Sequence, residues 1–173
     1  MTRQAMPAGP EWFGHPRGLF VCFATEMWER FSFYGMKYLL VLFLVQHHLF
    51  SDGEALRILG AYAALVYAMP LLGGIVSDRY LGQTKAVKLG GVLLVLGHCA
   101  MAFEGIPATQ GIAGEVVRDD QAITVFYFAL ALIVVGVGLL KPNISTVVGR
   151  LYGENDQRRD GGFTIFYLSL IHI

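Results

Sequence analysis

The sequence contains little charge and little cysteine. Aspartate, glutamate, lysine and arginine together make up only 15% of its 173 residues, whereas a soluble domain carries about 25%. The formal net charge is zero, so the chain has no excess of positive charge to attract a nucleic acid. Both cysteines, Cys22 and Cys99, lie in apolar runs, which favours buried free thiols and argues against a disulfide framework. We also expect no cleavable signal peptide, because the first apolar run is long and lacks a small-residue cleavage site.

Hydrophobic residues, by contrast, are abundant. They form 55% of the chain, which also has 12 phenylalanines and 21 glycines, and the mean hydropathy is +0.54. Glycine is frequent in membrane helices, where it lets backbones approach closely. The apolar runs predict an all-α membrane protein with four transmembrane helices and the start of a fifth. The expected helices span about 17–47, 54–77, 85–103, 122–150 and 161–168, after a polar cytoplasmic tail at 1–16.

Four charged residues interrupt the first apolar run: Glu26, Glu29, Arg30 and Lys37. The run is long enough to cross a bilayer, which needs about 20 residues. Charges at such depth are costly and normally face a cavity or a partner, so they are candidates for a functional site.

Helical geometry places these charges together. At about 100° per residue, the four charged residues and Tyr34 fall within about 140° of arc on one face. The alternative is the charged face of an ordinary soluble helix, but the flanking residues are apolar on all sides. The opposite face should meet lipid or neighbouring helices, and it carries Trp28, Phe31, Gly35 and Leu39.

A polar turn with two histidines separates the first two helices. His47 and His48 favour a solvated loop over a metal site, because no cysteine or carboxylate array accompanies them. We therefore expect no bound metal. Ser51 or Asp52 is placed to cap the second helix.

A proline and a tyrosine mark the middle of the second helix. Pro70 has no N–H, so the carbonyl of Val66 loses its helical partner and we expect a bend. Tyr67 lies one turn before that bend. It can be a packing aromatic or line a pocket, and its position alone does not separate the two.

The fourth helix carries a lysine in its interior. At least fifteen mostly apolar residues precede Lys141, and Pro142 follows it directly, which releases the carbonyl of Gly138. A buried lysine needs a carboxylate, and the first helix offers two glutamates. We expect Lys141 to lie about 4–6 Å from one of them, with Gly136 and Gly138 letting the first and fourth helices pack closely.

The charged stretch of the first helix reads Glu26-x-x-Glu29-Arg30-Phe31-x-x-Tyr34-Gly35. This spacing resembles the first-helix motif of the proton-dependent oligopeptide transporters, a branch of the major facilitator superfamily. The resemblance extends over about residues 12–167. Members of that family have twelve or more membrane helices, so the resemblance implies the N-terminal part of a helical bundle whose C-terminal bundle is missing from this sequence.

Two further segments are similar to the same family. The family also has a lysine at this place in the fourth helix, followed by a proline, as Lys141 is followed by Pro142 here. The segment Gly74-x-x-x-Asp78-Arg79-x-x-Gly82-x-x-Lys85 is similar to the short cytoplasmic hairpin between the second and third helices throughout the superfamily. Its glycines permit a tight turn, and its charges can gate the rocking of the bundles. A simple positively charged cytoplasmic loop is the alternative.

The resemblance implies a proton-coupled symporter of di- and tripeptides, without a cofactor and with protons as the coupling ion. Proton coupling would then fall to Glu26, Glu29 and Lys141. Substrate binding would fall to Arg30, Tyr34, Lys37, Tyr67 and Lys141.

Two positions depart from the family pattern. Lys37 stands where the family commonly has arginine, which removes bidentate binding of a carboxylate at that place. Gly60 stands where animal members carry a proton-linked histidine.

Other functions fit parts of the same pattern. Nitrate or another small anion could be carried on the same fold, but relatives that do so lack the paired glutamates. An intramembrane enzyme would need a nucleophile–base set or metal ligands, and none is apparent. The third alternative is an inactive truncated bundle or an accessory subunit, because alternating access needs two halves.

The last residues depart abruptly from the family after Tyr167. Members continue with Gly-Ile-Asn or a close variant, whereas this chain continues as Leu-Ser-Leu-Ile-His-Ile, which resembles translated sequencing adapter. We therefore expect residues 169–173 to be non-native. Asp160 is expected to cap the fifth helix.

The distribution of lysine and arginine predicts the orientation. Eight of these residues fall in segments expected on one side of the membrane and two, Arg57 and Arg118, on the other. The N-terminus is therefore expected in the cytoplasm of a bacterial cell, with the chain in the inner membrane. Residues 79–85 should face the cytoplasm and residues 108–120 the periplasm.

Overall fold

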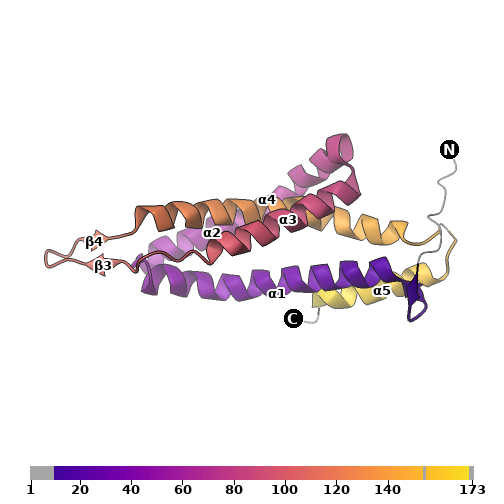
Figure 1. Cartoon of the computed structure of the whole chain (residues 1–173), viewed down its shortest axis with the longest axis horizontal. Coiled ribbons are helices and arrows are strands. Elements are labelled where there is room, and N and C mark those ends of the chain that lie inside the picture. The colour runs from indigo at the N-terminus through magenta and orange to yellow at the C-terminus, as the bar shows by residue number, and fades with distance from the viewer. Residues whose placement is uncertain (1–9, 154, 172–173) are drawn as a thin grey trace. The chain divides into compact units, whose positions relative to one another are not determined.

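The computed structural model describes residues 10–153 and 155–171. The described residues fall into two compact units, one containing the residues up to Gly35 and those from Ile144 onward, the other containing Met36–Asn143. The helices are α1 (Arg17–Gln46), α2 (Asp52–Val76), α3 (Gln83–Met101), α4 (Asp120–Arg150) and α5 (Arg158–Ile171), with a π-helical turn η1 (Ser77–Leu81). Two short hairpins pair β1 (Glu11–Trp12) with β2 (His15–Pro16) and β3 (Thr109–Gln110) with β4 (Val116–Val117) (Figure 1).

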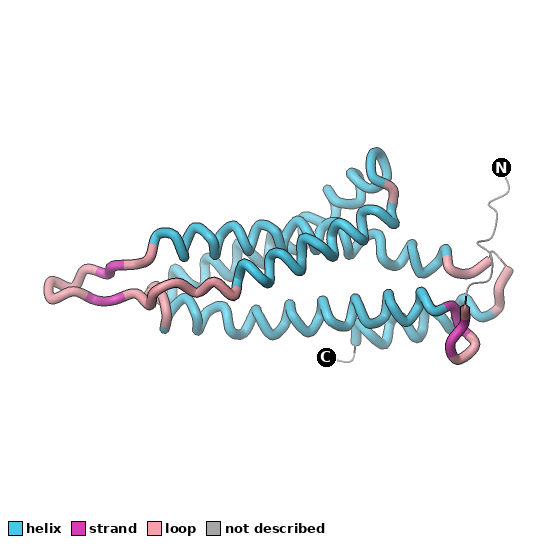
Figure 2. The backbone as a smooth tube through the Cα atoms, viewed as in Figure 1, coloured by secondary structure: helices cyan, strands magenta, loops and turns pink. Residues whose placement is uncertain are grey.

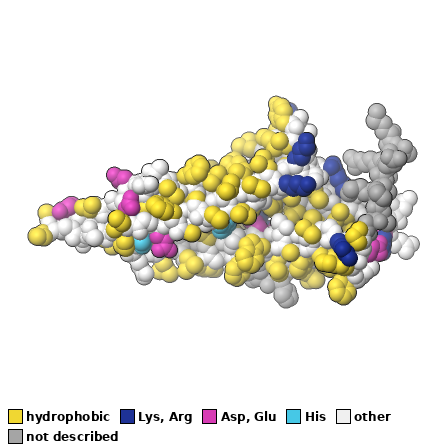
Figure 3. All heavy atoms as spheres, viewed as in Figure 1, with side chains coloured by type: hydrophobic (Ala, Val, Ile, Leu, Met, Phe, Trp, Pro, Cys, Tyr) yellow, Lys and Arg dark blue, Asp and Glu magenta, His cyan; other side chains and the backbone are white. Residues whose placement is uncertain are grey.

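Three helices among the described residues are long and apolar enough to cross a membrane. They are α2 with its continuation in η1, then α3, and then α4. α1 is 30 residues long, but its charged residues interrupt its apolar character. Large apolar side chains such as Leu71 and Val95 are 74% and 63% exposed, and yellow hydrophobic atoms cover much of the visible face (Figure 3). Helices that are apolar on their outer faces are suited to a lipid environment.

In the second unit, α4 packs against α2 and α3 through small residues. A Cβ on Gly73 of α2 would overlap the backbone carbonyl of Gly138, and a Cβ on Gly90 of α3 would come within 2.7 Å of the Gly136 carbonyl. More than half of the apolar stretch of α4 is buried, 56% against 17% for α2 and α3. Gly136 and Gly138 therefore serve contacts with α3 and α2, whereas the sequence suggested that they serve contact with the first helix.

Ser51 caps the N-terminus of α2, and the π-helical turn η1 follows its last residue. The Ser51 hydroxyl accepts the Glu54 N–H at 3.3 Å, and Glu54 Oε2 accepts the Ser51 N–H at 3.0 Å, so the two residues form a capping box. Asp52 lies inside the first turn. After η1, the chain turns at Gly82, whose φ of 74° suits glycine, and enters α3 at Gln83.

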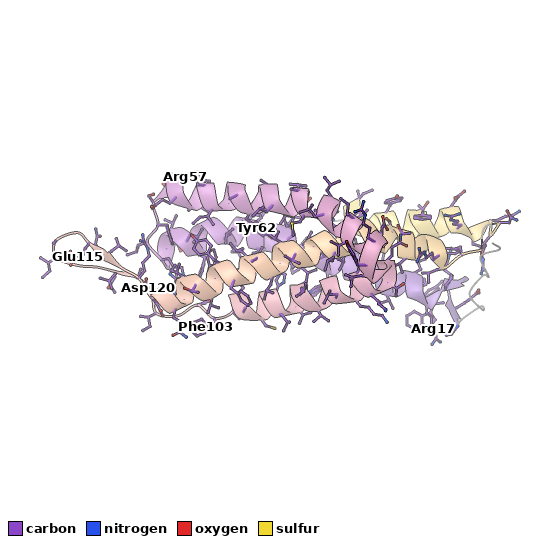
Figure 4. The ribbon with its side chains drawn as sticks, turned by 90° about the horizontal axis from the view of Figure 1, so that it is seen from above. Arg17, Arg57, Tyr62, Phe103, Glu115 and Asp120 are labelled. Carbon is purple, nitrogen blue, oxygen red and sulfur yellow. The ribbon has the colours of Figure 1, made fainter. Side chains whose placement is uncertain are left out.

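The segment between α3 and α4, which lies between the expected helices 85–103 and 122–150, contains the β3–β4 hairpin. The Gly111 N–H donates to the Glu115 carbonyl at 2.8 Å, and Gly114 turns the chain with a φ of 87°. The magenta strands of this hairpin extend beyond the ends of α3 and α4 (Figure 2). Figure 4 places Phe103 and Asp120 at the base of the hairpin and Glu115 near its tip.

The same segment caps the C-terminal end of α1. Leu49 has a φ of 51° and ends the helical path. The Arg118 guanidinium donates to the carbonyls of His48 and Leu49 at 2.7 and 3.0 Å, and the Ala108 N–H donates to the His47 carbonyl at 2.8 Å. Carbonyls that a helix end leaves without partners thus receive donors from the α3–α4 connection.

In the first unit, residues 11–16 form a hairpin where the sequence suggested a polar tail; the first nine residues of that expected tail lie outside the described residues. α5 starts at Arg158, and the Asp156 carboxylate accepts the Arg158 N–H at 2.9 Å. Asp160, expected as the cap, lies inside the first turn instead. The expected non-native tail begins within α5 at Ser169, and its residues 172–173 lie outside the described residues.

Candidate proton and substrate site

The charged face of α1 is turned inward and its apolar face outward. Glu26 and Glu29 are only 2% and 4% exposed, whereas Trp28 and Phe31 are 69% and 61% exposed. A soluble helix has the opposite arrangement. The helical periodicity of the sequence predicted this division of faces.

Arg30 joins the two buried glutamates. Its Nε lies 3.3 Å from Glu26 Oε1 and 3.7 Å from Glu29 Oε2. The three residues form a compact group with two carboxylates and one guanidinium on consecutive turns of one helix. Buried charge is costly unless it is compensated, and Arg30 supplies positive charge to both carboxylates.

Tyr34 and Lys37 follow on the same face of α1, and both are half-buried. The Tyr34 ring packs edge-on against Phe33, which is 4% exposed, with ring centroids 5.4 Å apart. Farther along the chain, Tyr67 of α2 is 71% exposed. It therefore does not serve as a core aromatic in the described chain, and its role in substrate binding stays a prediction.

Lys141 lies within α4, half-buried and followed directly by Pro142. Since proline has no N–H, the Gly138 carbonyl loses its usual donor, and this carbonyl faces Gly73 of α2. The glutamates and Arg30 belong to the first unit and Lys141 to the second. The approach of Lys141 to a glutamate stays a prediction.

Asn143, two residues after Lys141 in α4, takes part in a buried hydrogen bond. The Ser77 hydroxyl lies 2.7 Å from Asn143 Oδ1, and Asn143 Nδ2 donates to the Leu139 carbonyl at 2.8 Å. Ser77 and Asn143 are 0% and 2% exposed. Neither residue was predicted from the sequence. A signal was present, because an asparagine within an apolar helix needs polar partners.

The residues assigned to a gating loop are all exposed. Asp78 and Arg79 lie in η1, and Lys85 lies in the first turn of α3. Asp78 Oδ1 accepts a hydrogen bond from the Gln83 side chain at 3.4 Å, which links η1 to the start of α3.

The two histidines after α1 differ in environment, and His48 does not lie in a solvated loop as expected. It is 0% exposed, its ring lies edge-on to Phe43 with centroids 4.8 Å apart, and neither ring nitrogen has a hydrogen-bond partner among the described residues. Burial lowers the pKa of His48, with the positive charges of His47 and Arg118 adding to this effect. His47 instead bonds the Glu104 carbonyl through Nε2 at 3.0 Å. The described residues contain no group of three or more side chains placed to hold a metal.

Long apolar helices, backbone contacts through glycine and an inward charged face on α1 together define an all-α membrane protein with a buried charge cluster. The POT family model matches residues 84–171, about half of the chain. The chain belongs to the POT family.

Relatives cover almost all of this chain. It is 44% identical over 163 residues to an uncharacterized transporter, YclF, of Bacillus subtilis strain 168, with 91% of this chain covered. It is 41% identical over 165 residues to the di-/tripeptide transporter of Lactococcus lactis subsp. lactis, also with 91% covered. A crystal structure of the peptide transporter POT in complex with sulfate matches 96% of this chain at 40% identity with a TM-score of 0.80.

The chain spans only about a third of the length of these proteins. It covers 30% of each of the two relatives and 31% of the chain in the crystal structure. The expected resemblance to proton-dependent oligopeptide transporters is confirmed, and so is the expected fragment-sized coverage.

Proposed function

We propose that this chain is the N-terminal portion of a proton-coupled symporter of di- and tripeptides. The observation that carries the proposal is the buried group of Glu26, Glu29 and Arg30 on the inward face of α1. The di-/tripeptide transporter of Lactococcus lactis, 41% identical, supports the substrate class.

The charges of the candidate site complement a peptide. A zwitterionic peptide carries a carboxylate and an ammonium group. Arg30 and Lys37 would bind the carboxylate, Arg30 through a planar guanidinium and Lys37 as a single point charge. The glutamate side of the group would face the ammonium, and Tyr34 and Tyr67 would contact the peptide between its ends.

Proton coupling follows from the charge balance. The group contains two carboxylates that Arg30 contacts, and either a proton or Lys141 can interact with a carboxylate there. When a glutamate takes up a proton, its attraction for Lys141 weakens, and the lysine becomes available to substrate. Proton binding would thereby favour one state of the transporter over the other.

We propose that the rest of the transport machinery lies outside this chain. Alternating access in this class of fold needs two halves that move against each other. We propose that a C-terminal helical bundle completes the pocket, and that Asp78, Arg79 and Lys85 gate the movement at the cytoplasmic side. The proposed location is the bacterial inner membrane with a cytoplasmic N-terminus, and the protein is proposed to act as a transporter and not as an enzyme.

The test is uptake by the complete transporter that contains this chain. It would be reconstituted into proteoliposomes, and accumulation of a labelled dipeptide would be measured with and without an inward proton gradient. We expect gradient-dependent accumulation that unlabelled di- and tripeptides suppress and that free amino acids and nitrate do not. Accumulation of nitrate without accumulation of dipeptide would replace the proposal with an anion carrier.

A further inference from the structure

The hairpin before α1 carries an exposed aromatic residue in an unfavourable backbone conformation. Phe13 and Gly14 join β1 to β2 with φ values of 49° and 76°, the positive values that a tight two-residue hairpin turn requires. Glycine adopts this conformation freely, but a phenylalanine does so at a cost. Phe13 is nevertheless 93% exposed, so only little packing against the described chain offsets that cost.

The polar side of this hairpin is fixed to the rest of the first unit. Arg158 Nη1 donates to the Glu11 carboxylate at 2.9 Å and to the Gly14 carbonyl at 3.0 Å. His15 Nδ1 lies 2.8 Å from the Tyr152 hydroxyl. These contacts hold the hairpin beside the start of α5 and leave Phe13 in its turn exposed.

Three aromatic rings gather at that tip. The rings of Trp12 and Phe13 each lie 6.0 Å from the ring of Phe20, in the first turn of α1. The Arg17 guanidinium carbon lies 5.0 Å from the centroid of the Trp12 ring. Figure 4 shows Arg17 at the beginning of α1. We call Trp12, Phe13 and Phe20 the aromatic tip.

We propose that the aromatic tip and Arg17 anchor this end of α1 in the headgroup region of the lipid bilayer, with Arg17 binding lipid phosphate. Aromatic rings are enriched at membrane–water interfaces, and a guanidinium on a long side chain can reach the anionic headgroups while its stem stays in apolar surroundings. The tip continues directly into a helix long enough to cross a bilayer, and the protein-facing side of the hairpin is already occupied. Insertion of Phe13 into the interface would offset the strain of its backbone.

This proposal does not rest on the cargo of the transporter, so its test needs no transport assay. The chain has two tryptophans, and Trp28→Phe leaves Trp12 as the only one. This variant of the full chain would be reconstituted into phosphatidylcholine vesicles containing lipids brominated near either the carbonyl end or the methyl end of the acyl chain. We expect the shallow bromines to quench Trp12 fluorescence at least about twofold more strongly than the deep ones, and acrylamide to quench it weakly.

Two variants in the Trp28→Phe background separate the roles of ring and charge. Phe13→Asn removes the ring but suits the positive φ, so the helical circular dichroism should be unchanged while shallow quenching falls and the Trp12 emission moves to the red. Arg17→Gln should remove any increase of shallow quenching that phosphatidylglycerol produces. Strong quenching by acrylamide without lipid quenching would place the tip in water, and protection from both quenchers would mean that protein covers it. Either result overturns the proposal.

Discussion

Ser77, which follows the last residue of α2 and begins η1, and Asn143 within α4 share a buried hydrogen bond of 2.7 Å. The bond lies where Pro142 interrupts the backbone hydrogen bonds of α4, two residues after Lys141. It therefore ties α2 to the part of α4 that carries the candidate coupling lysine.

Replacing Ser77 by alanine should destabilise the chain by about 1–3 kcal/mol, because it leaves the Asn143 Oδ1 atom buried without its donor. The measurement is the free energy of unfolding in detergent micelles. Ser77→Ala combined with Asn143→Leu removes both partners and should cost less than Ser77→Ala and Asn143→Leu summed. Additive losses would show that the two side chains contribute independently.

Gly73→Ala should destabilise the contact between α2 and α4, because the new Cβ would overlap the Gly138 carbonyl. Overpacking of this kind costs about 1–3 kcal/mol. Gly91→Ala in α3 is the matched control, since a Cβ there meets nothing within 4 Å, and alanine is the better helix former. Thermal unfolding in micelles should show a lower midpoint for the first variant alone. Equal midpoints would argue against close α2–α4 packing.

The proposed switch of Glu26, Glu29 and Lys141 predicts the behaviour of three variants of the complete transporter. Glu26→Gln, Glu29→Gln and Lys141→Ala should each abolish dipeptide uptake driven by a proton gradient, because each removes one member of the proposed switch. Glu115→Gln in the exposed β3–β4 hairpin is the control and should transport normally. Gradient-driven uptake at the normal rate in any of the three variants, with matched expression, would mean that coupling lies elsewhere.

Stability should depend on pH through His48. The pKa of His48 is lowered by burial and by the positive charges of His47 and Arg118, while Asp119 opposes this shift. The unfolded chain therefore binds a proton at a higher pH than the folded chain, so stability is complete above about pH 6.5 and declines as pH falls below it. His48→Phe should reduce the drop in unfolding midpoint between neutral and mildly acidic buffers. An unchanged drop would assign the pH dependence to other groups.

The loops on either side of α3 should lie in different compartments. Reporter fusions at Gly82, after η1, and at Gly114, in the β3–β4 hairpin, should give opposite results, with Gly82 cytoplasmic. The same compartment for both would contradict the four-span topology.

The sequence could predict the face of α1 but not the partners of its residues. The 3.6-residue period is local, so Glu26, Glu29 and Arg30 could be placed together and turned inward from their spacing alone. The loss of a backbone hydrogen bond at Pro142 in α4 could also be predicted from the sequence, because it depends on one residue and its own helix.

The missed features all depend on segments far apart in the chain. Ser77 and Asn143 are separated by 66 residues, and nothing near either residue specifies the other. The glycines of α4 had several possible neighbours, and only the packed structure assigns Gly136 to α3 and Gly138 to α2. His48 appeared solvated because its local sequence is polar, whereas aromatic rings and the α3–α4 connection surround it.

The Arg118 contacts have a consequence for the order of assembly. The guanidinium that donates to the His48 carbonyl belongs to a residue 70 positions later in the chain. A ribosome adds residues one at a time, starting from the N-terminus. During synthesis, the carbonyls of His48 and Leu49 therefore need water as their hydrogen-bond donor at first. Arg118 can donate to them only after α2, α3 and the β3–β4 hairpin have been synthesised.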